Sequence, residues 1–252
     1  MNQEKQRQVS QLCTSKRRVW QPNNPPPLSE TSKAPDTTSR CLSLTALEPA
    51  VASFIKTGLS RSDSSKLDPE LASTLLRNVE DEVRHEVALT RAAAALVGRV
   101  DHSAAAGQLI QEWEDLSDNP ITKAAVLECG VFFVILPLYS QFGGASLRIT
   151  SASISGDERL HVISHRAASQ AIGARPSRAL DKLRRDTVAW ISETLGYEDG
   201  GHWGKDRMVA HSDTFMKRGV SDLAESQVAN VNAPYEISNN SIESYATGSE
   251  PG

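Results

Sequence analysis

Apolar residues recur every three or four positions along most of the chain, which is the spacing of one buried face on an α-helix. No stretch shows the strict alternation of a half-buried strand. Helix-starting and helix-stopping residues separate the periodic stretches, among them Asp68 and Pro69 at one start, and Ser177 and Gly196 around another helix. Helices are predicted over residues 45–57, 68–97, 103–116, 119–139, 147–172, 178–195 and 205–228. The pattern therefore predicts an all-α fold, with Pro137 ending or kinking the fourth helix.

The two ends of the chain differ from this helical region in composition. Residues 1–42 are polar, contain three consecutive prolines at 25–27, and carry seven Lys or Arg against three Asp or Glu. This composition favours a disordered or extended basic segment. Residues 229–252 are rich in Asn and Ser and are expected to form a polar tail. The predicted organisation is thus a disordered segment over 1–42, a helical bundle over 43–228 and a tail over 229–252.

Charge and cysteine content exclude several classes of protein. The net charge of −4 and the isoelectric point near 5.9 give no general attraction to nucleic acid or to an anionic membrane. The longest apolar run, residues 131–138, is too short to span a bilayer, and no apolar segment of a secretory signal is visible at the start. Three cysteines without a Cys-x-x-Cys pair indicate a reducing compartment, so we expect a cytoplasmic protein.

Two Glu-x-x-His motifs interrupt the apolar faces of the second and fifth predicted helices. Each is preceded, about thirty residues upstream, by another glutamate on an apolar helical face. The six residues are Glu48, Glu82, His85, Glu128, Glu158 and His161. Residues three apart lie on the same side of a helix, so each motif can offer both groups to one metal ion. Buried carboxylates are costly unless paired, and this order of ligands is typical of a dinuclear metal site in a four-helix bundle.

Carboxylate and imidazole ligands suit iron or manganese better than zinc. Some individual residues allow two roles. Glu48 can close a capping box with Thr45 instead of binding metal. Asp157 can orient a ligating histidine through its other ring nitrogen, or can be an ordinary exposed carboxylate. Glu86 and His165 share the ligand-bearing faces, but we expect them to be solvated or to support the ligands.

The residues around the second half of this pattern resemble a known family. A glutamate followed by aromatics at 127–133, then Ile-x-x-Asp-Glu-x-Leu-His at 154–161, resembles the third and fourth metal-binding helices of the ribonucleotide reductase small subunit. Over residues 43–172 the full ligand set resembles the ferritin-like di-iron carboxylate superfamily. Leu89 stands where that reductase family usually has its radical tyrosine.

The resemblance implies a ferritin-like four-helix bundle with one or two additional C-terminal helices. It implies that the six residues above bind two Fe ions, or an Fe/Mn or Mn/Mn pair, and that Asp157 is a hydrogen-bond partner of a ligating histidine. The implied function is an oxidoreductase that activates O2 or peroxide with electrons from a donor. A homodimer and a large reductase subunit are partners consistent with this reading. Two alternatives stay open: a ferroxidase or iron-storage protein, and a non-catalytic helical interaction protein.

Overall fold

A computed structural model of the chain describes residues 1–22, 47–94, 103–142, 144–196 and 204–217. Within these ranges the regular elements are helices and none is a strand, which confirms the all-α prediction. The elements in chain order are α1 (Gln3–Lys16), α3 (Pro49–Leu59), the 3-10 turn η3 (Ser62–Lys66), α4 (Pro69–Ala94), α5 (Ser103–Asp115), α6 (Pro120–Leu127), the π-helical segment η4 (Glu128–Phe132), α7 (Phe133–Phe142), α8 (Gly144–Ile172), α9 (Arg178–Leu195) and α10 (Lys205–Lys217).

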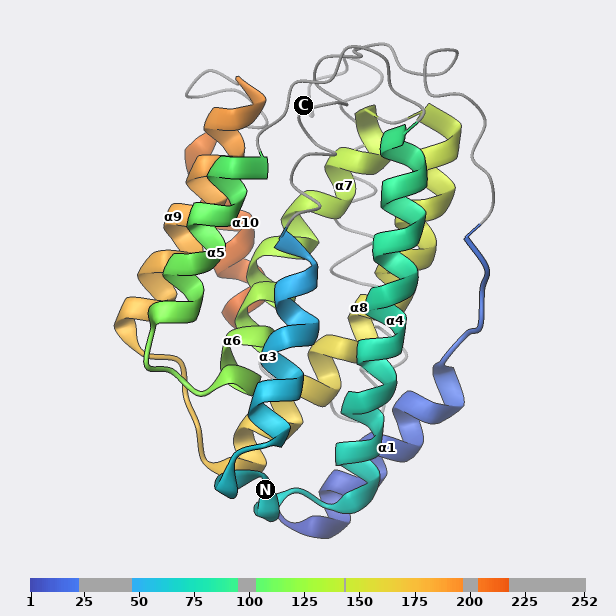
Figure 1. Cartoon of the computed structure of the whole chain (residues 1–252), viewed down its shortest axis with the longest axis vertical. Coiled ribbons are helices and arrows are strands. Elements are labelled where there is room, and N and C mark those ends of the chain that lie inside the picture. The colour runs from blue at the N-terminus through green and yellow to red at the C-terminus, as the bar shows by residue number, and fades with distance from the viewer. Residues whose placement is uncertain (23–46, 95–102, 143, 197–203, 218–252) are drawn as a thin grey trace, which may run out of the picture.

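Four helical segments enclose the interior of the protein (Figure 1). Helix α3 packs on α4 and on α6, and α8 packs on α4, α6 and α7, so the segments close a ring. Helices α9 and α10 pack on each other and cover the segment from α6 to α7, while α5 packs on α9. The ring brings one face of each of its helices to a common interior, and the outer helices shield one side of it.

The helix ends follow local sequence signals. The side chains of Asp68, Asn119 and Ser177 each accept a hydrogen bond from a backbone N–H in the first turn of the helix that follows, at 3.0, 2.9 and 3.1 Å. Helix α9 ends at Gly196, whose φ of 72° is the left-handed conformation that glycine adopts without strain. These ends were predicted from the sequence and are confirmed.

The prediction of disorder is wrong for the start of the chain, because residues 3–16 form α1. This helix packs on α4 and α8 through a polar face. The Gln6 side chain accepts a hydrogen bond from the backbone N–H of Asp68 at 2.7 Å, and the Ser10 hydroxyl donates to the carbonyl of Glu70 at 2.9 Å. Hydrogen bonds rather than an apolar stripe hold this helix in place. Its sequence therefore lacks the pattern that indicates a buried helix, and its polar composition suggested disorder. Residues 23–42, 218–228 and 229–252, for which a segment, a helix end and a tail were predicted, lie outside the described residues.

The chain between residues 120 and 142 continues through Pro137, which lies inside α7 rather than ending a helix. The stretch Pro120–Tyr139 is long and apolar enough to cross a membrane. The uninterrupted apolar run within it, residues 131–138, had been judged too short to do so. All of it is buried inside the protein, however, and the central helix of a folded core has the same composition. We therefore take it as the core helix of this fold.

The π-helical segment η4 is held from outside by α9 and α10. A π turn widens the helix by one residue and is often found at functional sites. The Ser212 hydroxyl, on α10, donates a hydrogen bond to the carbonyl of Gly130, and it accepts one from the guanidinium of Arg184 on α9. Gly130 permits this approach because a Cβ there would overlap Cδ of Arg184 and lie 3.0 Å from its Cγ.

We expect Gly130→Ala to lower the free energy of unfolding by about 1–3 kcal/mol, because Arg184 is held by its own hydrogen bonds and cannot move aside freely. Urea denaturation of the metal-free protein measures this change. Gly107→Ala on α5 is the matched control, since a Cβ there meets nothing within 4 Å. It should stabilise the protein by up to about 1 kcal/mol through helix propensity. Equal losses in both variants would contradict the proposed close contact.

Candidate metal centre

All six predicted ligands lie in the interior enclosed by the four helical segments. Glu48 directly precedes α3, Glu82 and His85 lie on α4, Glu128 begins η4, and Glu158 and His161 lie on α8. Each of them is 4% exposed or less. The helices therefore bring together side chains that are more than 100 residues apart in sequence, and they do so away from solvent.

Glu82 and Glu158 each lie between the two histidines. Glu82 presents Oε1 to His161 Nδ1 at 2.9 Å and Oε2 to His85 Nδ1 at 3.6 Å. Glu158 presents Oε1 to His85 Nδ1 at 3.1 Å and Oε2 to His161 Nδ1 at 3.2 Å. Each carboxylate thus offers one oxygen to each histidine.

Glu128 lies at the His161 end of this arrangement. Its Oε1 is 3.3 Å from His161 Nδ1. Glu82, Glu128, Glu158 and His161 can each offer one ligand atom such that all four atoms lie within 4.8 Å of one another. This compact group could hold one metal ion.

Glu48 is associated with the His85 end. Burial raises the pKa of its carboxyl group well above the usual value, His85 opposes that rise, and the charges of Glu82 and Glu158 add to it. Although Glu48 occupies the N-cap position of α3, its side chain makes no capping hydrogen bond, and Oε2 has no hydrogen-bond partner. The expected capping partner, Thr45, lies outside the described residues.

The ligand atoms of this cluster are buried without hydrogen-bond partners. They are Oε2 of Glu48, both carboxylate oxygens of Glu82, Glu128 and Glu158, and Nδ1 of His85, His161 and His165. A buried carboxylate that lacks a partner costs several kcal/mol. Metal cations among these atoms would satisfy them, so the donor set fits a metal site.

The other ring nitrogens of the two histidines are held by a crossed pair of aspartates. Asp157, on α8, lies 3.1 Å from Nε2 of His85 on α4, and Asp81, on α4, lies 3.4 Å from Nε2 of His161 on α8. Such a partner fixes the ring and leaves Nδ1 free to bind metal. Sequence analysis did not single out Asp81. The signal was present, because both motifs read Asp-Glu-x-x-His.

The segment that follows α1 contacts both of these aspartates. The indole N–H of Trp20 donates to Oδ2 of Asp157 at 2.7 Å, and its ring stacks on His85 with 6.1 Å between centroids. The guanidinium of Arg17 contacts Oδ1 of Asp81 at 2.6 Å. Neither residue was singled out from the sequence, because residues 1–42 were expected to be disordered.

The two other residues on the ligand-bearing faces behave differently from each other. Glu86 is exposed. His165 is fully buried, and its Nδ1 lies 3.7 Å from Oε1 of Glu128. Burial, the charge of His161 and an opposing effect of Glu82 bring the pKa of His165 down to about 3, so its imidazole is neutral at physiological pH.

The remaining histidines of the site form ion pairs in the metal-free protein. Burial lowers the pKa of His85, but its contacts with Asp157, Glu158 and Glu82 outweigh burial and hold the pKa well above the usual value. The pKa of His161 is likewise raised. Burial alone would raise the pKa of Glu82, yet its ion pairs with His161 and His85 lower it to about 2. Protons thus partly neutralise the cluster when metal is not bound.

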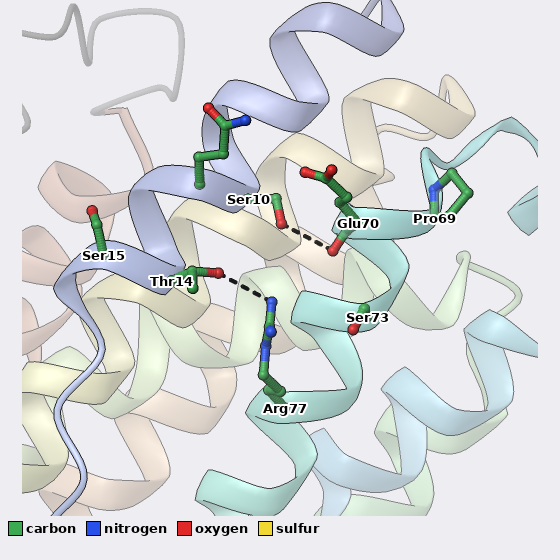
Figure 2. Close-up of a pocket in the computed structure, with 8 residues that line it drawn as sticks. Ser10, Thr14, Ser15, Pro69, Glu70, Ser73 and Arg77 are labelled. Carbon is green, nitrogen blue, oxygen red and sulfur yellow. Dashed lines mark hydrogen bonds between the residues drawn. The ribbon is translucent and has the colours of Figure 1, made fainter.

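A surface hollow between α1 and α4 is separate from this cluster. Figure 2 shows the polar residues that line it, with Arg77 donating a hydrogen bond to the Thr14 hydroxyl at 3.1 Å. The hollow contains none of the candidate metal ligands.

Comparisons with known proteins gave no relative. No family model, curated protein or solved structure matches this chain. The ligand pattern and the geometry of the cluster are therefore the grounds for assigning a function.

Metal binding to this cluster should release protons, because histidine must be neutral and carboxylates ionised to act as ligands. The protons should come from His85, His161 and Glu48, whose pKa values are raised by their surroundings. The apparent affinity should therefore rise with pH. Titration of Mn(II) into weakly buffered protein with an indicator dye measures the release. Metal binding without proton release would show that these groups do not exchange a proton for the metal.

Proposed function

We propose that the chain is a ferritin-like dimetal carboxylate oxidoreductase, similar in its chemistry to the ribonucleotide reductase small subunit. The observation that carries this proposal is the set of buried ligand atoms without hydrogen-bond partners. It weighs against a non-catalytic interaction protein, because a core that served packing alone would not bury four carboxylates around two histidines. The helices that enclose the cluster, α3, α4, α6 to α7 and α8, would be the four helices of the ferritin-like bundle.

A pair of iron or manganese ions bound here would supply the electrons that reduce O2 or peroxide, and an external donor would restore them. The protein's residues have distinct parts in this chemistry. Glu82 and Glu158 would each hold both ions, because each offers one oxygen toward each histidine. Asp81 and Asp157 fix the histidine rings, so that Nδ1 rather than Nε2 faces the metal. Glu48 and Glu128 complete the two ends.

The surroundings favour oxidation of a substrate over storage of a tyrosyl radical. Leu89, at the place of the family's usual radical tyrosine, is fully buried in the core. Tyr139 is the one tyrosine within the described ranges, and it lies eleven residues beyond Glu128 on the chain. Phe132 and Phe133, which follow Glu128 on the chain, are buried apolar residues. We therefore propose a small apolar substrate, or an apolar part of a larger one, as the group oxidised.

Anaerobic titration with Fe(II) tests the proposal directly. The wild-type protein should bind two ions per chain, and exposure to O2 should then produce the absorption band of an oxo-bridged diferric site. Glu82→Gln and Glu158→Gln keep side-chain volume but remove a bridging charge. Each should abolish binding at one or both positions and remove the absorption band.

Glu86→Gln is the matched control for these variants. It makes the same chemical change on α4, one turn beyond Glu82, at an exposed side chain. Its stoichiometry should remain two. If the two bridging variants also bound two ions with unchanged affinity, the dimetal proposal would be wrong.

A further inference from the structure

His165 lies at one end of the candidate metal centre, beside Glu128 and His161. The ring is fully buried, and Nδ1 has no hydrogen-bond partner. Nδ1 lies 3.7 Å from Oε1 of Glu128, and the same oxygen lies 3.3 Å from Nδ1 of His161. The rings of His161 and His165, one helical turn apart on α8, lie 5.8 Å apart. One carboxylate oxygen therefore lies near the Nδ1 atoms of two neighbouring imidazoles.

The two separations from Oε1 of Glu128 each fit a pair of ligands on one metal ion. Ligand atoms about 2.0–2.2 Å from a metal lie about 3 Å apart when adjacent and about 4.3 Å apart when opposite. The separations of 3.3 and 3.7 Å fall inside that range. The separation of 3.7 Å is too long for a hydrogen bond, so a direct bond from His165 to Glu128 does not explain the arrangement.

The other side of the His165 ring contacts a side-chain amide. Nε2 lies 3.1 Å from Nδ2 of the Asn78 side chain on α4, and the same Nδ2 donates to the Ser164 hydroxyl at 2.8 Å. A metal-bound imidazole carries its proton on Nε2, so the amide would turn its oxygen toward His165 and accept that proton. Asn78 would then do for His165 what Asp157 does for His85 and Asp81 for His161.

The repeat of the motif makes the position of His165 informative. Four residues after His161 the chain has His165, whereas four residues after His85 it has Leu89. Both side chains are fully buried. The two halves of the site therefore differ at this place. One half has the nitrogen donor His165, and the other has the apolar side chain of Leu89.

We propose that His165 is a third histidine ligand, bound through Nδ1 to the metal position that Glu128 and His161 share. This inference rests on the proposed dimetal function. The position near His161 gains a neutral nitrogen ligand and binds metal more tightly. The position near His85 has Leu89 in place of that ligand, which leaves a coordination site open to oxidant or substrate. The two ions therefore bind in sequence rather than together.

Titration with Co(II), followed by proton NMR, tests the proposal on the wild-type protein. A ligating imidazole bound through Nδ1 gives one strongly shifted, solvent-exchangeable signal from its Nε2 proton. The wild type should bind two ions in two separate steps and show three such signals, two of which arise in the first step. Failure to bind Co(II), Fe(II) or Mn(II) at all would overturn the dimetal function itself. Two bound ions with only two shifted signals would overturn the role of His165 alone.

Variants at this position assign the third signal. His165→Gln should remove it and weaken the first binding step by at least about 100-fold, which is the upper end of the loss expected for an outer partner. His165→Ala should show the same loss, and added imidazole should restore the tight step by entering the space left by the ring. Asn78→Asp keeps an acceptor for the Nε2 proton, so it should retain three signals.

His211→Gln is the matched control, because it removes an exposed histidine on α10. It should keep both binding steps and all three signals. Circular dichroism of each variant distinguishes loss of a ligand from loss of the fold. A folded His165→Gln protein with an unchanged first step would show that this ring only packs beside the site.

Discussion

The structure depends on one unfavourable arrangement, which is the burial of carboxylates and imidazoles whose ligand atoms have no hydrogen-bond partner. Charges in a protein interior lose their hydration, and attraction between imperfectly paired groups offsets that loss only in part. Protons on His85 and His161 reduce the imbalance, as the raised pKa of each ring indicates. Divalent cations would remove it. The helices around the cluster are therefore best understood as a frame whose stability and metal content depend on each other.

The crossed aspartates, Asp81 and Asp157, link the packing of α4 on α8 to the positions of the ligating histidines. Each Asp-Glu-x-x-His motif supplies a bridging glutamate and a histidine, and its aspartate contacts the histidine of the opposite helix. A shift of α4 along α8 would break both contacts at once, so the register of these helices and the geometry of the site are one property. The first segment of the chain strengthens this link, because Arg17 holds Asp81 and Trp20 holds Asp157.

Local signals made much of this predictable from the sequence. Capping residues such as Asp68 and Ser177 act within one turn, so the helix starts could be located without knowledge of the fold. The ligand residues were visible because charge on an apolar helical face is rare. Helix α1 was missed because its buried face is polar and its partners lie about sixty residues away. The π turn at Glu128 was missed because the residues that support it are distant in sequence. Arg184 comes from α9 and Ser212 from α10.

The repeated motif suggests a symmetric centre, but the residues around it are not symmetric. On one side, His85 lies beneath the stacked ring of Trp20, and Glu48 comes from a helix start. On the other side, Glu128 comes from a π turn, and His165 adds a further buried nitrogen beside it. Two metal ions in such surroundings would differ in charge, ligand number and exposure to reactants. In the proposed oxidoreductase, that difference would give the oxidant one preferred place to react, whereas two equivalent ions would offer two.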